Sequence, residues 1–108
     1  MPPIDFNELD TTVHGPVRLG ILTALQMDGP HNFTTLKKRL RASDGALGTH
    51  LQTLETEEYI ASKKAFVGRR PRTTYRLTPQ GRMALARYLE AMRRLLDAMA
   101  PAKTPPPG

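Results

Sequence analysis

Residues 43–77 read SDGALGTHLQTLETEEYIASKKAFVGRRPRTTYRL, and a change of pattern within this stretch decides the fold. In its first part, Leu47, Leu51 and Leu54 recur at the spacing that places side chains on one face of a helix. Ser43 precedes them as a helix cap, and Asp44 stands in the first turn, where a negative charge is favourable. We therefore predict a helix that begins after Ser43 and buries its leucines.

A β-hairpin is predicted directly after this helix. Residues 60–67 and residues 73–77 are rich in residues that favour strands. Between them lies Gly68-Arg69-Arg70-Pro71-Arg72, whose glycine and proline are typical of a turn. The expected hairpin therefore carries three arginines at its tip.

Two further helices are predicted before this stretch. Pro16 suits the first position of a helix that carries an apolar pattern from Val17 to Leu25 and ends at residues 28–30. Residues 31–33 are expected to add one short edge strand. Thr34 or Thr35 is expected to cap a second helix, on which Leu36 and Leu40 lie one turn apart.

A long helix is predicted after the hairpin, with Thr78 as its cap, Pro79 at its first position and its end near Met99. Three helices, a hairpin and a long helix make a mainly α (α+β) winged helix-turn-helix domain, with a two-stranded wing and a C-terminal dimerisation helix. We assign residues 1–100 to this single domain, with a short helical turn at residues 5–9. Residues 101–108 are rich in proline and are expected to form a disordered tail.

The charge of the chain is concentrated in its middle. The net charge is +6, and residues 36–76 hold ten basic and four acidic residues, so this segment carries the whole excess. Such clustering favours a polyanionic partner. In a helix-turn-helix the third helix enters the DNA major groove. The residues predicted to bind DNA are Lys37, Lys38, Ser43, Asp44, Gly45, Gly48, Thr49, His50, Gln52, Lys63, Lys64, Arg69, Arg70 and Arg72.

Two features of this set favour DNA. Gly45 and Gly48 each destabilise a helix by roughly 0.5–1 kcal/mol relative to alanine, and close approach to a groove is one reason to retain them. Arg69, Arg70 and Arg72 repel one another unless an anion is near, and arginines on a hairpin suit a narrow minor groove. The alternatives are a late-ordering amphipathic surface helix and a solvated charged turn.

The last helix is predicted to pair with a second copy of the chain, together with the N-terminal segment. Its apolar residues recur at steps of three and four, close to a heptad seam. The predicted dimer residues are Phe6, Leu9, Leu85, Tyr88, Leu89, Met92, Leu95, Leu96 and Met99. The alternative is a helix that only covers the core of its own chain.

An enzyme is not expected. The three histidines are far apart, and neither a carboxylate pair nor a nucleophile with a base stands out, so we predict no catalytic residue, metal site or cofactor. The chain has no cysteine, which excludes disulfides and thiolate zinc sites. A leader peptide and a long apolar run are both missing from the sequence, so we expect a cytoplasmic protein.

Residues 17–99 resemble the MarR/ArsR-like winged helix regulators, most closely the small single-domain bacterial group. The resemblance lies in GPVRLGIL (15–22), SDGALGTHLQTLE (43–55), FVGRRPRT (66–73) and YRLTPQG (75–81). It implies a dimeric regulator that reads DNA with the third helix, through Asp44, Gly45, Gly48, Thr49 and His50, and with the three wing arginines. The chain departs from the family in lacking the cysteine clusters of many ArsR-type relatives. It also has Gly48-Thr49 where serine, arginine or lysine often precedes His-Leu.

The sequence therefore predicts a homodimeric transcriptional regulator that binds double-stranded DNA sequence-specifically, with its recognition helix in the major groove and its wing at the minor groove. Two alternatives remain open: a winged helix that grips another protein, and a nonspecific architectural DNA binder. No residue identifies a small-molecule effector.

Overall fold

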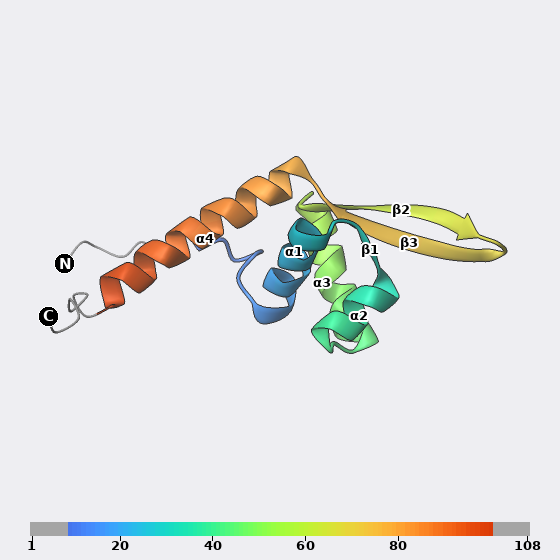
Figure 1. Ribbon diagram of the computed structural model, residues 1–108, viewed down its shortest axis with the longest axis horizontal. Coiled ribbons are helices and arrows are strands. Elements are labelled where there is room, and N and C mark those ends of the chain that lie inside the picture. The colour runs from blue at the N-terminus through green and yellow to red at the C-terminus, as the bar shows by residue number, and fades with distance from the viewer. Residues whose placement is uncertain (1–8, 101–108) are drawn as a thin grey trace, which may run out of the picture.

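The computed structural model describes residues 9–100 and confirms the winged helix arrangement (Figure 1). The elements are α1 (Pro16–Asp28), β1 (His31–Asn32), α2 (Phe33–Leu40), α3 (Asp44–Thr56), β2 (Ile60–Val67), β3 (Arg70–Leu77) and α4 (Pro79–Met99). The predicted tail and most of the predicted turn at residues 5–9 lie outside the described residues. None of the helices within residues 9–100 is both long and apolar enough to cross a membrane.

The molecule is elongated, with principal extents of 64 × 30 × 24 Å. Helices α1, α2 and α3 form a central body, from which the β2–β3 hairpin extends in one direction and α4 in the opposite direction (Figure 1). We call residues 60–77 the wing. The wing and the far end of α4 are therefore separate surfaces of one small molecule.

Local hydrogen bonds set where the helices begin. Ser43 and Thr78 cap α3 and α4 as predicted, because their hydroxyl oxygens accept from the amides of Ala46 and Gly81, at 3.2 and 2.9 Å. The predicted cap of α2 was wrong. Asn32 caps this helix, with its side-chain oxygen 2.8 Å from the amide nitrogen of Thr35. Strand β1 ends at Asn32, so the chain passes from strand to helix without an intervening loop.

The sheet has the order β1-β3-β2, with both pairs antiparallel. The short edge strand predicted near residue 31 is present as β1. Val67 pairs with Arg70, so only Gly68 and Arg69 form the turn, and Gly68 has a φ of 67°, which glycine adopts without strain. The prediction that the turn reaches residue 72 was therefore wrong. Pro71 is tolerated in β3 because β1 does not reach it, which leaves that edge unpaired.

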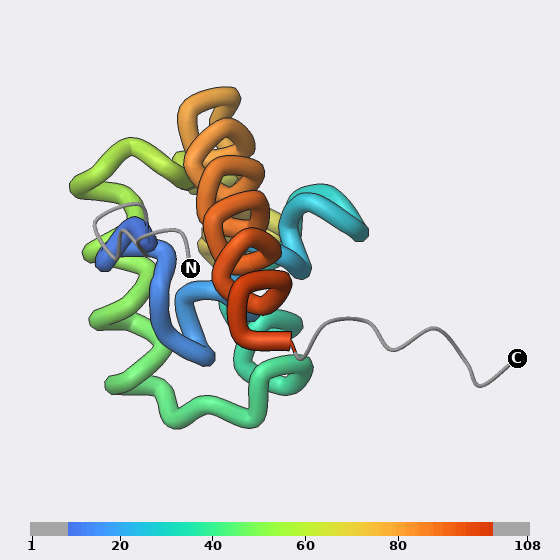
Figure 2. Tube along the Cα trace, turned by 90° about the vertical axis from the view of Figure 1, so that its left-hand side faces the viewer, coloured from blue at the N-terminus to red at the C-terminus, as the bar shows by residue number. Residues whose placement is uncertain are grey.

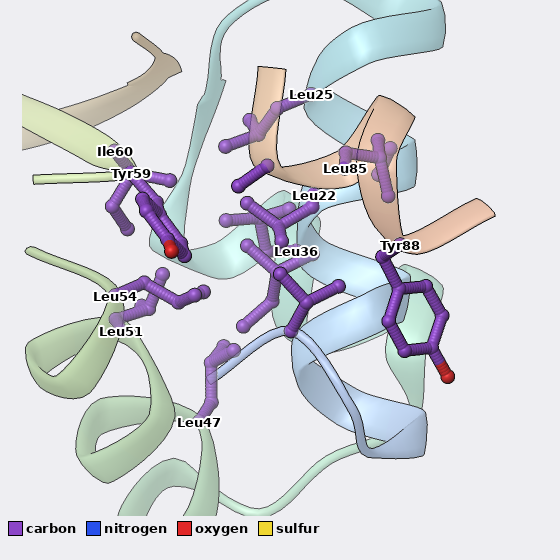
Figure 3. Close-up of a cluster of buried hydrophobic side chains, with 14 residues drawn as sticks. Leu22, Leu25, Leu36, Leu47, Leu51, Leu54, Tyr59, Ile60, Leu85 and Tyr88 are labelled. Atoms are coloured by element: carbon purple, nitrogen blue, oxygen red, sulfur yellow. The ribbon is translucent and has the colours of Figure 1, made fainter. Parts of the chain in front are cut away.

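The core joins α1, α2 and α3 to the first half of α4. Leu22 and Leu36 lie at its centre, with the leucines of α3 on one side and Leu85 and Tyr88 on the other (Figure 3). Leu47, Leu51 and Leu54 are buried as predicted. Gly81 lets α4 approach the end of α3 closely, because a Cβ there would lie 2.0 Å from the carbonyl oxygen of Tyr59.

Two long-range hydrogen bonds between side chains tie the segment before α1 to the rest of the chain. The Tyr59 hydroxyl donates to a carboxylate oxygen of Asp10 at 2.5 Å, and Nδ1 of His14 lies 2.8 Å from the Tyr88 hydroxyl. This segment therefore lies between α3 and α4 (Figure 2). The hydrogen bond to Asp10, together with burial, raises the pKa of Tyr59 to about 12.

This raised pKa predicts an alkaline dependence of stability. The ordinary pKa of tyrosine is 10.0, so the stabilisation by neutral Tyr59 is complete below about pH 10 and is lost as the pH rises towards about 12. Urea denaturation across this range should show a steeper loss of unfolding free energy for the wild type than for Tyr59→Phe. Equal slopes for the two proteins would contradict the bond to Asp10.

Candidate nucleic-acid interface

The outer face of α3 carries only short or uncharged side chains beyond its first residue. Burial of the leucines turns Asp44, Gly45, Gly48, Thr49 and Gln52 outward, and we call these five residues the outer face of α3. The hydroxyl groups of Thr53 and Thr56 donate to backbone carbonyl oxygens of their own helix. Because two of the five residues of the face are glycines with open space around them, the face is shallow and its backbone is accessible.

The two glycines of this face have no role in packing within the described chain. A Cβ built on Gly45 or Gly48 meets no atom within 4 Å, whereas a Cβ on Gly81 collides with backbone. Each helical glycine still lowers stability by roughly 0.5–1 kcal/mol relative to alanine. Their retention therefore suits a partner that must come close to the helix backbone.

An ion pair joins the two helices of the helix-turn-helix. Nζ of Lys37 lies 2.8 Å from a carboxylate oxygen of Asp44, so these two predicted DNA-binding residues neutralise each other. Lys38 is exposed and forms no ion pair with any residue from 9 to 100. Arg39 instead pairs with Asp28 and thereby lowers the pKa of that carboxyl group. Of the cations on α2, Lys38 is thus the one left for a phosphate.

The wing gathers cations mainly on one face. Residues directly opposite in an antiparallel pair share a face, and Val67, Ala65, Lys63 and Ala61 lie opposite Arg70, Arg72, Thr74 and Arg76. Four cations therefore lie on the face that points away from the core: Lys63, Arg70, Arg72 and Arg76. Lys64 lies on the other face and Arg69 in the turn. We call these six residues the wing cations.

All six wing cations are exposed, and within the described part of the chain none has an acidic partner. Arg76 was missing from the predicted DNA-binding residues. It is separated from Arg70 and Arg72 by an even number of positions, which in a strand places all three side chains on one face. An open groove of about 610 Å³ separates the start of α2 from the unpaired edge of β3, and Thr35, Arg70 and Arg72 are among the residues that line it. The arrangement leaves positive charge where a polyanion has free access.

Two other residues predicted to bind DNA, Ser43 and His50, lie at the start and on the flank of α3. Ser43 uses its hydroxyl oxygen as the cap of α3. His50 is partly buried, and its Nδ1 has no hydrogen-bond partner among the described residues. No group of three potential metal-binding side chains comes together within residues 9–100.

The predicted dimer residues divide into two sets. Leu85 and Tyr88 are buried in the core of their own chain, which leaves them no surface for a partner, so their assignment to an interface is corrected. Leu9 is partly buried against the same core, and Phe6 lies outside the described residues. Along the rest of α4, Met92 and Leu95 are half-buried, while Leu89, Leu96 and Met99 are 46%, 59% and 70% exposed.

Comparisons with known proteins agree with this geometry. Residues 17–96 match the model of the winged helix DNA-binding domain family. The protein MJ0432 of Methanocaldococcus jannaschii is 34% identical over 73 residues, which is 68% of this chain and 79% of that protein. A transcriptional regulator homologue from Pyrococcus horikoshii superposes with a TM-score of 0.79 at 26% identity, covering 88% of this chain and 95% of the other. A MarR family regulator from Silicibacter pomeroyi shares the fold, with a TM-score of 0.65 at 21% identity over 93% of this chain and 66% of the other.

The glycines of α3 give a test in which stability and binding move in opposite directions. Gly48→Ala should raise the unfolding free energy by about 0.5–1 kcal/mol, because alanine favours the helix and the site is open. The same methyl group should weaken DNA binding about tenfold, if it meets a closely apposed groove. Urea denaturation and fluorescence anisotropy measure the two effects.

Gly81→Ala is the control for this test. Its added Cβ meets the backbone of Tyr59, so this variant should lose stability. A Gly48→Ala protein that gains stability and binds DNA as tightly as the wild type would contradict close approach at α3.

Proposed function

The chain belongs to the family of winged helix DNA-binding domains, and from this premise we propose that it is a homodimeric transcriptional regulator that recognises specific sequences in double-stranded DNA. The resemblance to MarR/ArsR-like regulators agrees with the family match and with the solved structures. The observation that carries the proposal is the combination of six exposed wing cations, unpaired within residues 9–100, with a shallow helix face on the same domain. A regulator acts where the chromosome lies, and we propose the cytoplasm as its location.

In the proposed complex α3 enters the major groove with its outer face towards the base edges. Gln52 can form two hydrogen bonds with adenine, and the methyl group of Thr49 can contact a thymine methyl group. Gly45 and Gly48 allow the helix backbone to come close to the bases. His50, on the flank, and Lys38, on the neighbouring helix, contact phosphates and fix the register of the helix.

The wing is proposed to contact the minor groove next to the site of α3. A hairpin that enters tip first presents Arg69 to the groove and its two faces to the two phosphate backbones. Lys63, Arg70 and Arg72 then lie towards one backbone and Lys64 towards the other. These contacts supply affinity and make it sensitive to salt, whereas α3 supplies most of the sequence preference.

The second half of α4 is proposed to form the dimer interface. After Ala91 no residue of this helix is fully buried, although Leu95, Leu96 and Met99 continue its apolar pattern. A short apolar helix that projects into water is marginally stable by itself, so a second copy of α4 would stabilise it. Two-fold symmetry would then present two recognition helices to the two halves of a palindromic site.

Selection of bound duplexes from a random pool tests the proposed function directly. We expect a two-fold symmetric motif whose half-sites are separated by about one helical turn. Bound DNA with no common motif would indicate an architectural binder. No retained DNA at low salt would indicate a winged helix that binds another protein.

The wing cations predict a change in salt dependence. Arg70→Ala combined with Arg72→Ala should lessen the slope of log K against log salt by about 1.8, because two phosphate contacts are lost. The control is Arg82→Ala combined with Arg87→Ala, which removes the same charge from the exposed side of α4. Equal slopes for the two double variants would contradict contact by the wing.

If α4 forms the dimer interface as proposed, charged substitutions on its exposed apolar residues should give a monomer. Leu89→Glu combined with Leu96→Glu changes only exposed positions, so each chain should fold normally but remain monomeric in analytical ultracentrifugation. Met27→Glu alters an even more exposed apolar residue on α1 and should leave the dimer intact. A stable dimer of the double variant would place the interface elsewhere.

A further inference from the structure

The outer part of the wing carries apolar side chains that the core does not use. Phe66 is 76% exposed and Val67 is 54% exposed, next to the turn. Phe66 lies directly opposite Pro71, so the two share one face of the hairpin, within two residues of the turn. An aromatic ring and a proline thus form an apolar pair near the end of the wing.

Neither Phe66 nor Pro71 belongs to the residues that are buried in the core or packed against it. The residues of this strand face that are buried or packed against the core all lie at the base of the wing. They are Ile60, Tyr75 and Leu77. The wing also extends away from α4, so a dimer formed through α4 leaves Phe66 exposed (Figure 1). Neither folding nor the proposed dimer accounts for the pair.

The charge around the pair indicates its partner. Lys64 lies on the same face as Phe66 and Pro71, and Arg69 lies beside them in the turn; neither cation has an acidic partner within residues 9–100. A hydrophobic protein surface that covered Phe66 would have to leave these cations unpaired, at a cost in free energy. DNA offers phosphates for the cations and base-pair faces for the ring.

We propose that Phe66, supported by Pro71, is an apolar wedge that enters the minor groove between two stacked base pairs and bends the DNA at the wing. The proposal rests on the proposed function and adds a specificity-determining residue to it. Wedges of this kind partly unstack a base step, and the bent duplex then contacts more of the protein. Phe66 touches bases in this complex, while the wing cations other than Arg69 touch phosphates.

The wedge adds sequence preference without hydrogen bonds to bases. Pyrimidine–purine steps unstack more easily than other steps, and A-tracts resist bending. The duplexes that bind best should therefore carry a TA or CA step where the wing sits. Replacement of that step by an A-tract should weaken binding of the wild type and have much less effect on Phe66→Ala.

The experiment uses the full chain and one duplex that the wild type selects from a random pool. Energy transfer between dyes at the two ends of the duplex reports bending. The fluorescent adenine analogue aminopurine, placed at the wing step, reports unstacking. Phe66→Ala should straighten the duplex, abolish the rise in aminopurine fluorescence and weaken affinity about tenfold. Met27→Ala, which removes an exposed apolar side chain from α1, should change none of these readings.

Two further measurements keep the result clear if Phe66→Ala also loosens the hairpin. A loosened hairpin would shift the backbone amide resonances of both wing strands in the free protein, whereas loss of the ring alone shifts only the resonances next to residue 66. Phe66→Leu keeps an apolar side chain and should retain most of the bend. A duplex that stays equally bent and unstacked with Phe66→Ala overturns the wedge while leaving DNA binding intact. Failure of the wild type to bind any duplex overturns the proposed function, and the wedge with it.

Discussion

Burial of Leu47, Leu51 and Leu54 against the body determines which face of α3 meets a partner. Full burial of each leucine stabilises the fold by about 1.5–3 kcal/mol, which far exceeds any preference of the opposite face. The helix therefore has one stable orientation, in which Thr49, Gln52 and the two open glycines point outward. The proposed recognition surface is a consequence of how the core packs.

The same packing separates the charges of the molecule. Acidic residues pair with two of the cations of the body, Lys37 with Asp44 and Arg39 with Asp28. The wing has no such partners among the described residues, and its strand register places Lys63, Arg70, Arg72 and Arg76 on one exposed face. Because the wing and the second half of α4 extend in opposite directions, the proposed DNA-binding surface and the proposed dimer surface lie at opposite ends of the chain (Figure 1).

Much of this architecture could be predicted from the sequence because it depends on local signals. The caps at Ser43 and Thr78, the leucine spacing of α3, the strand at residues 60–67 and the end of α4 at Met99 all follow from the order of neighbouring residues. Features that depend on distant contacts could not be predicted in this way. Leu85 and Tyr88 have the spacing of an interface seam but are buried in the core of their own chain. The turn is two residues long because the pairing of β2 with β3 continues as far as Val67 and Arg70.

The most direct test of the central claim is an NMR titration. The backbone amide resonances of the isotope-labelled chain are recorded as a selected duplex is added. We expect the shifts to concentrate on the outer face of α3 and on residues 63–72, and the second half of α4 to be unaffected. Shifts confined to α4, or spread evenly over the molecule, would contradict the placement of the DNA interface on α3 and the wing.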